Sequence, residues 1–519
     1  MAGVVGRVSL RSSVSRAALA TGIAVIFTQS ALAQSVQQVR PQTQNEGSGA
    51  AAVEGSVELS PITVEGNSPN ALNATTGLAR LPGTIQDTPQ IVNVISQQTL
   101  QEQNVTTLEE ALRNVPGVTQ AIGEGNGGLN GDQFKLRGFE AKGDIYLDGL
   151  RDFGVYVRDS FNAEEIQVLK GPSSESFGMG TTGGAINTSA KTPFLQDMFG
   201  ATIGGGNGPM GRATVDVNRK IGEATAIRIN ALYHDQDIVG RDHVHSDRWG
   251  FAPSIAFGLG TDTNWTLSYF FQHTDRTPDY GVPMLIVPPG TAASKGLPIT
   301  EFGVPRSTFY GKETDHDVSN VHMLTSRFKK EVNSWLTISN DTRVAWYRRD
   351  FATSGPVCAG TTTSPAAYAA SCSGQFFAGL DPTYTYTGGS PTYLQRSWGA
   401  QNVLTANAKF NTGFLRHELV VGLDLFYQED HRDAGQTVGT KTAGTVRNPN
   451  YLNTGYALLP NPNSLRHSTG GDIGVFASDR IWFTDQWSIL GGIRYDRYKA
   501  SYRNFNGTVW TEERAESDL

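Results

Sequence analysis

A glycine-rich string in this chain has the spacing that nucleotide binding requires. Its three glycines follow a predicted strand and are Gly178, Gly180 and Gly183. A dinucleotide site needs a helix next, because the helix N-terminus holds the pyrophosphate. Turn and strand residues follow here instead, so we interpret the glycines as tight turns and not as a nucleotide site.

Four acidic and imidazole side chains between two predicted strands could ligate a metal ion, and these are Asp242, His243, His245 and Asp247. Loops between strands carry such residues on a solvated surface, which is the interpretation we favour. No Ser/His/Asp or paired-carboxylate spacing stands out elsewhere. We therefore expect that the protein is not an enzyme and has neither a cofactor nor a metal site.

The chain has two cysteines, Cys358 and Cys372, in a stretch rich in Gly, Ser, Thr and Pro. A metal site or a catalytic thiol would require a nearby histidine, and none occurs between Arg349 and Arg396. If the chain is exported, these cysteines form a disulfide that closes a surface loop, worth about 2–4 kcal/mol.

Export is indicated by residues 1–33, which have the pattern of a secretory signal peptide. A basic region with Arg7, Arg11 and Arg16 precedes an apolar stretch at 17–27, and an Ala-Leu-Ala cleavage site ends at Ala33. The apolar stretch is too short to cross about 30 Å of hydrocarbon as a helix. The mature protein is therefore expected in an oxidising compartment or beyond it.

Residues 34–74 have a low-complexity composition that predicts a solvated tether. One segment within it differs, and its residues are Pro61, Ile62, Thr63, Val64 and Glu65. Ile-Thr-Val is β-prone, and the proline prevents a helix from continuing through it. Such an isolated extended segment suits addition to the sheet edge of another protein, with a plain linker as the alternative.

Residues 75–193 have the pattern of a compact α+β domain. Short strands are predicted at 91–95, 134–137, 145–147 and 166–169. Thr106 and Glu109 have the spacing of a capping box before an apolar helix that ends at Pro116.

From residue 197 to residue 519 apolar and polar residues alternate with a period of two. Segments of about 10 residues with one apolar face and aromatic ends occur, for example, at 227–234, 265–272, 419–427 and 487–495. Tight turns alternate with long loops between them. This pattern predicts an antiparallel transmembrane β-barrel with aromatic girdles, and a soluble β-sandwich is the alternative.

The barrel region accommodates about 12 strands, whereas plugged transporters close at 22 strands. The final residues are charged and lack a terminal aromatic strand, so we expect that the chain is cut off within the barrel.

The composition agrees with a barrel. The net charge of −7 argues against a nucleic-acid-binding protein, and charged residues are only 18% of the chain while glycines number 59. Outside the N-terminus no apolar run approaches the roughly 18–20 residues of a membrane helix.

The middle domain closely resembles the plug of TonB-dependent siderophore receptors. The matching strings lie at 88–95, 108–118, 136–139, 145–152, 165–174 and 178–193. The string Arg-Asp-Phe-Gly-x-Tyr-x-Arg-Asp at 151–159 resembles the catecholate branch in particular. The barrel region resembles this family only in its general strand pattern.

This resemblance implies an α+β plug inside a barrel of the outer membrane, and import of a ferric siderophore as the activity. Residues 61–65 would be the TonB box, which periplasmic TonB pairs with and pulls. The tether is too short for the folded domain of receptors that also signal to transcription, so we expect transport alone. Iron would remain on the siderophore, without a protein ligand.

The expected ligand is an anionic catecholate complex, for which arginines and aromatic rings are suitable partners. The candidate binding residues are Arg151, Tyr156, Arg158, Gly125 and Asn126. Arg151 or Arg158 pairing inside the plug with Asp152 or Asp159 is the alternative. Arg137 and Lys170 lie where the family has plug cations that face barrel carboxylates.

Two other functions remain open from the sequence. The chain could be a structural or adhesive outer-membrane protein, or a receptor fragment that transports nothing. It could also be a transporter for heme, cobalamin or a glycan.

Overall fold

The computed structural model describes residues 75–121, 131–178, 180–287, 296–361, 364–386, 391–452 and 455–518. These residues belong to one compact unit, Gly66–Leu519. The predicted signal peptide, the tether with residues 61–65, and the candidates Gly125 and Asn126 lie outside the described residues.

The plug, by which we mean the described residues from 75 to 193, contains a five-stranded sheet in the order β1-β7-β8-β5-β6. Its strands are β1 (Ile91–Ser96), β5 (Ile145–Leu147), β6 (Leu150–Arg151), β7 (Ala163–Lys170) and β8 (Gly184–Ala190). A smaller sheet contains β2 (Val118–Gln120), β3 (Phe134–Leu136) and β4 (Phe139–Glu140). The helices are α1 (Gln97–Glu102), α2 (Leu108–Leu112), η1 (Ser160–Asn162) and α4 (Ser174–Phe177).

The core of the plug forms where α2 packs on the sheets. Leu108, Ala111 and Leu112 of α2 are buried with residues from β3, β5, β7 and β8. The helix cap differs by one residue from the predicted one: Thr107 is the N-cap, and its side chain accepts a hydrogen bond from the amide of Glu110. The Glu110 carboxylate in turn accepts from the amide and hydroxyl of Thr106, so the second threonine and the second glutamate form the cap.

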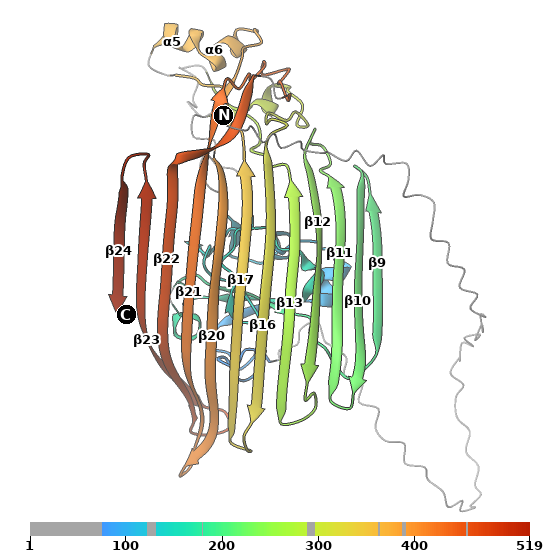
Figure 1. Cartoon of the computed structure of the whole chain (residues 1–519), viewed down its shortest axis with the longest axis vertical. Helices are drawn as coiled ribbons and strands as arrows, with labels where there is room; N and C mark the ends of the chain where they lie inside the picture. Colours follow the sequence, from blue (N-terminus) through green and yellow to red (C-terminus); the bar gives the residue numbers. More distant parts are fainter. Residues whose placement is uncertain are drawn as a thin grey trace, which may run out of the picture. The chain divides into compact units, whose positions relative to one another are not determined.

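The remaining long strands form a single 12-stranded antiparallel sheet, shown in Figure 1, which we call the barrel sheet. Its strands are β9 (Met198–Gly206), β10 (Met210–Gly222), β11 (Thr225–Asp237), β12 (His245–Phe257), β13 (Thr263–Arg276), β16 (His316–Glu331), β17 (Leu336–Ala352), β20 (Thr392–Thr412), β21 (Leu415–Gly439), β22 (Tyr456–Trp482), β23 (Ser488–Phe505) and β24 (Trp510–Asp518). The expected number of about 12 strands is confirmed. The sheet is not closed, since β9 and β24 form its two edges.

The two faces of the barrel sheet differ as the alternating pattern predicted. On β11, Ile229 and Tyr233 are 44% and 58% exposed on the outer face. Arg228, Asn230 and His234 alternate with them and are buried on the inner face. An apolar outer face and a polar inner face are typical of strands that cross an outer membrane. None of the described helices has the length and apolar character that crossing a bilayer requires.

Short turns join the strands at one end of the barrel sheet, and the longest loops, which follow β13, β17 and β21, lie at the other end. Three long loops lie there, and the first two contain β14 (Met284–Ile286), β15 (Gly296–Pro298), η2 (Ile299–Phe302), β18 (Pro356–Val357), α5 (Pro365–Ala370), α6 (Cys372–Phe377) and β19 (Thr385–Tyr386). They share an apolar core that includes Leu285, Tyr310, Tyr384 and Val446. The disulfide between Cys358 and Cys372 lies within this loop cluster, and Cys358 is fully buried.

Candidate ligand cavity and plug contacts

The plug is held against the inner face of the barrel sheet by hydrogen bonds to several strands. The amide of Arg151 donates to Gln401 Oε1 at 2.7 Å, and Gln272 Nε2 donates to the carbonyl of Val157 at 2.6 Å. Arg343 Nη1 donates to the carbonyl of Leu147 at 2.8 Å. The structure therefore places the plug on the inner face of the barrel sheet, as the resemblance implied.

Ion pairs across this contact mostly join plug carboxylates to barrel arginines. They are Asp159 with Arg212 and Arg248, Asp148 with Arg327 and Arg343, and Glu164 with Arg228. Two pairs have the opposite polarity, Arg80 with Asp424 and Lys191 with Asp216. The plug therefore contributes both signs of charge, with aspartates in the larger share.

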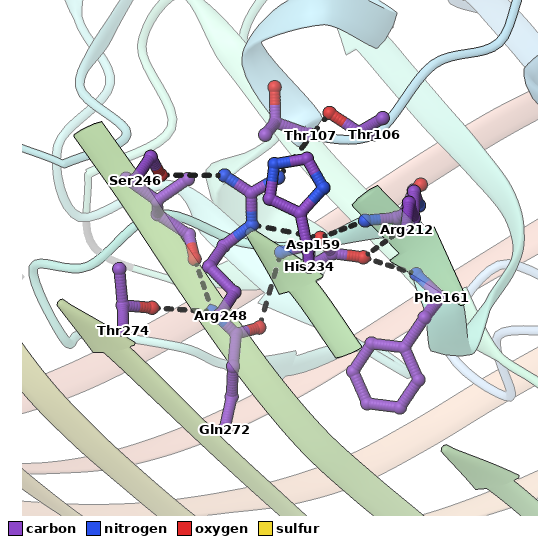
Figure 2. A network of polar contacts seen from close by, with 12 residues as sticks. Thr106, Thr107, Asp159, Phe161, Arg212, His234, Ser246, Arg248, Gln272 and Thr274 are labelled. Atoms are coloured by element: carbon purple, nitrogen blue, oxygen red, sulfur yellow. Dashed lines mark hydrogen bonds and ion pairs between the residues drawn. The ribbon is translucent and has the colours of Figure 1, made fainter. Parts of the chain in front are cut away.

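Asp159 has the most extensive of these contacts, and Figure 2 shows its surroundings. Arg212 donates to both carboxylate oxygens at 2.7 and 2.9 Å, and Arg248 Nε donates to one of them at 3.0 Å. The same carboxylate caps η1 by accepting from the amide of Phe161, while the amide of Asp159 donates to Gln272. Burial acts to raise the pKa of Asp159, but the hydrogen bond from Arg212 and the charges of both arginines lower it below its usual value.

The plug loop at 153–156 lies under a cavity near the long-loop end of the barrel sheet. The cavity volume is about 190 Å³, and its floor is formed by Phe153, Gly154, Val155 and Tyr156. Its wall residues come from several strands and include Ser319, Tyr347, Arg349, Gln395, Ser397 and Gln428. Aromatic rings and polar groups thus line the same cavity.

Three aromatic rings meet at this cavity floor. The ring centroids of Phe153 and Tyr347 are 4.8 Å apart in an edge-on arrangement, and those of Tyr156 and Tyr347 are 6.1 Å apart. The hydroxyls of both tyrosines donate to Asp152, at 2.7 Å from Tyr156 and 2.9 Å from Tyr347. The buried carboxylate therefore fixes the two rings relative to each other.

Arg158 binds inside the plug and is not among the residues that line this cavity. Its Nε donates to Asp152 at 2.7 Å, its Nη2 donates to the carbonyls of Asp152 and Gly154, and its guanidinium lies 3.6 Å from Asp132. Of the two interpretations left open for Arg158, the structure has the pair with Asp152. Direct ligand contact would require Arg158 to leave this pair. In the structure Arg158 therefore positions the loop at 153–156.

Asp132 shares this buried cluster. Burial raises the pKa of its carboxyl to about 6, although the nearby charge of Arg158 and a hydrogen bond from the Arg158 amide oppose the shift. The pKa of this carboxyl below the cavity floor is thus raised toward the physiological range.

Arg151 lies beside the cavity floor. Its guanidinium donates to the carbonyls of Gly143 and Phe177, and it lies over the rings of Tyr146 and Phe426 at 5.5 and 5.8 Å. Of the three described candidates, Tyr156 is the one that lines this cavity. The contact of Arg151 with a ligand stays a prediction.

Arg137 and Lys170 lie close together, and the charge of Arg137 adds to burial in lowering the pKa of Lys170. Among the described residues, no ion pair joins either one to a barrel carboxylate. Their role as barrel contacts stays a prediction.

The structure also places the two other groups singled out from the sequence, the glycine string and the histidines His243 and His245. The glycine string is followed by strand β8, and Gly178 has a φ of +81°, a backbone conformation that favours glycine. His243 stacks on Tyr451, while His245 Nδ1 is hydrogen-bonded to Thr277. Neither histidine belongs to a potential metal-binding group among the described residues.

Comparisons with known proteins agree with this architecture. Residues 84–185 match the TonB-dependent Receptor Plug Domain, and residues 248–517 match the TonB dependent receptor-like beta-barrel. The chain belongs to the TonB-dependent receptor family. Members of this family are receptors and transporters with a β-barrel in the outer membrane.

Among its relatives, this TonB-dependent receptor is 32% identical over 422 residues to the catecholate siderophore receptor Fiu of Escherichia coli K12, covering 80% of the chain and 54% of Fiu. It is 29% identical over 440 residues to the probable TonB-dependent siderophore receptor PiuA of Acinetobacter baumannii, covering 81% of the chain and 56% of PiuA. The chain thus spans about half the length of the curated relatives it matches.

Solved structures of siderophore receptors are also similar to this TonB-dependent receptor. The closed form of the ferric-catecholate import receptor Fiu from Escherichia coli K12 superposes with a TM-score of 0.73 at 28% identity, covering 85% of this chain and 64% of that one. The siderophore receptor PiuA from Acinetobacter baumannii superposes with a TM-score of 0.73 at 27% identity, covering 86% and 63%.

Proposed function

We propose that this protein imports a ferric siderophore of the catecholate class across the outer membrane. Family membership supports transport, and the similarity to Fiu supports the catecholate class. Iron travels as cargo on the siderophore, so the protein needs no resident cofactor and performs no enzymatic step.

The observation that carries this proposal is the aromatic and polar cavity above the plug loop. Phe153 and Tyr347 offer ring faces and edges to a planar catechol, with contacts worth about 0.5–1.5 kcal/mol each beyond area burial. Arg349 supplies a cation at the same wall, although its guanidinium already donates to Asp317 and Tyr393. Because the cavity of about 190 Å³ is smaller than typical ligand pockets of roughly 300–1,000 Å³, we expect it to receive one catechol arm.

In this proposal the energy that releases the ferric siderophore through the barrel comes from outside the outer membrane. The segment at 61–65 pairs as an added strand with TonB in the periplasm, and traction on it displaces part of the plug. The ion pairs of Asp159 and Asp148 are the contacts that such traction has to break.

The experiment that tests this function is iron uptake by cells in which this protein is the sole outer-membrane iron receptor. Cells receive iron-55 as a ferric catecholate, a ferric hydroxamate or heme, and labelled cobalamin in parallel. We expect TonB-dependent uptake of the ferric catecholate alone. Uptake of heme or cobalamin without the catecholate, or equal uptake in a strain that lacks TonB, would overturn the proposal.

A further inference from the structure

A cluster of two histidines and one glutamate lies on the outer face of the barrel sheet, away from the lumen. On β21 the exposed residues Val421, Leu425 and Tyr427 alternate with inward residues such as Asp424. Glu429 and His431 continue the outward set by the same alternation. His467 of β22 is the cross-strand partner of His431 and therefore shares this face.

The three side chains converge on one point. His431 Nε2 lies 2.8 Å from Glu429 Oε1, and His467 Nε2 lies 3.0 Å from the same oxygen. The two imidazole rings stack with centroids 4.1 Å apart and planes 11° from parallel. One ligand atom from each of the three residues lies within 4.8 Å of the others, which no other such group of the described residues achieves.

This spacing is close to what a metal ion requires. Bonds of about 2.0–2.2 Å at tetrahedral angles place neighbouring ligand atoms roughly 3.4 Å apart. The observed N–O distances of 2.8 and 3.0 Å are shorter than this, so ion binding requires the side chains to separate and the stacked imidazole rings to turn until both Nε2 atoms face the ion.

Trp398 holds the carboxylate in the orientation that the site needs. Its indole Nε1 donates to Glu429 Oε2 at 2.9 Å, which leaves Oε1 to face the histidines. Trp398 lies opposite Glu429 on β20, so the ladder of three adjacent strands fixes all four residues. A hydrogen bond that orients a ligating carboxylate is the usual support of a protein metal site.

The site is open to solvent, and Glu429 gives it one negative charge. The His431 side chain is 46% exposed, and those of Glu429 and His467 are each 23% exposed. Two cations on the same face are engaged elsewhere: Arg396 pairs with Asp433, and Arg503 lies over the Trp510 ring.

We propose that Glu429, His431 and His467 bind one divalent ion of the borderline class, Zn²⁺, Cu²⁺ or Ni²⁺, on the outer surface of the receptor. Imidazole nitrogen with a single carboxylate favours these ions over Ca²⁺ and Mg²⁺, which prefer oxygen ligands. Three protein ligands leave at least one coordination position open to water or to an anion. The bound ion joins β21 to β22 and plays no part in carrying iron through the lumen.

The test is titration of the purified chain in detergent, free of any polyhistidine tag, with Zn²⁺ against a chromogenic chelator. We expect one tight equivalent in the wild type, its loss in the double variant His431→Gln/His467→Gln, and weaker binding by about 10–100-fold in Trp398→Phe. Cu²⁺ bound at the same stoichiometry should show electron paramagnetic resonance with hyperfine coupling to two nitrogens. The control is His273→Gln on β13, whose histidine is hydrogen-bonded to Asn320.

Each outcome decides for or against the site. Full binding by the double variant, absence of a tight equivalent in the wild type, or equal affinity for Mg²⁺ would overturn the proposal. Loss of the equivalent in His273→Gln would equally overturn it. Near-ultraviolet circular dichroism of each variant verifies that it has the wild-type fold, and Trp398→Phe tests the site with every ligand retained.

Discussion

Asp159 and Arg212 form a two-point ion pair between the plug and β10, with N–O distances of 2.7 and 2.9 Å. The Asp159 side chain is completely buried in this contact. Arg248 adds a third hydrogen bond, so a single plug carboxylate is shared by two barrel arginines. A buried charge shared in this way is costly to expose, and the pair therefore fixes one edge of the plug to the wall.

We expect Asp159→Ala to destabilise the seated plug by about 3–5 kcal/mol, because two buried arginines lose their partner. Pulse proteolysis of the full chain across a urea series, with cleavage followed within residues 75–193, measures this change. The matched control is Arg219→Ala, which breaks an ion pair with Asp197 that is more than half exposed on both sides. That variant should change stability by less than about 1 kcal/mol. Equal stability of both variants would contradict the role of Asp159.

Asp132 should make plug stability depend on pH. Its pKa of about 6 in the folded state exceeds the roughly 3.9 of an unfolded aspartate, so the folded state binds the proton more tightly. Above about pH 6 the ionised carboxylate therefore lowers the free energy of unfolding. This free energy rises as pH falls from about 6 to about 4.

The measurement is the difference in unfolding free energy between the wild type and Asp132→Asn from pH 7 to pH 4. This difference should shift by on the order of 3 kcal/mol in favour of the wild type as the pH falls. A difference that is constant over this range would mean that the pKa of Asp132 is not raised.

Lys312 should hold the loop cluster together. Its buried ammonium donates to the carbonyls of Thr442, Asn450 and Leu452 at 2.5 to 3.0 Å. Lys312→Met leaves these carbonyls without that partner, at about 1–3 kcal/mol for each one that stays buried. We expect amide hydrogen exchange at 440–452 to accelerate at least about tenfold. The control Lys329→Met alters an exposed lysine, and similar exchange in both variants would refute the prediction.

The tether segment should matter for transport and not for binding. Ile62→Pro removes a backbone donor from an added strand and is expected to abolish uptake of ferric siderophore. Binding of the ferric siderophore at the cell surface should remain at the wild-type level. Uptake at the wild-type rate would remove residues 61–65 from the mechanism, and loss of surface binding would indicate misfolding.

The strands and the plug core were predictable because they follow from local periodicity. Leu108, Ala111 and Leu112 recur with helical spacing, and Ile229 and Tyr233 alternate with polar neighbours, so each pattern defines its own buried face. The cap at Thr107 differed by one residue because two threonines and two glutamates follow one another, and the sequence alone does not select between the pairs.

The contacts of the site were not predictable in the same way. Asp159 meets Arg212 and Arg248, which are 53 and 89 residues away, and a lone aspartate gives no periodic signal. Glu429 and His467 are 38 residues apart and meet because β21 and β22 pair in that register. The string at 151–159 contains the residues of the cavity floor, whereas the direction in which Arg158 points depended on the buried positions of Asp152 and Asp132.

The most direct test of a ligand cavity built on the plug loop is an equilibrium titration of the purified chain with a ferric tris-catecholate, followed by quenching of intrinsic fluorescence. The account predicts saturable binding by the wild type, affinity lower by at least about tenfold in Phe153→Ala, and unchanged affinity in Phe139→Ala, which alters an exposed plug ring. Wild-type affinity in Phe153→Ala, or no saturable binding at all, would contradict it.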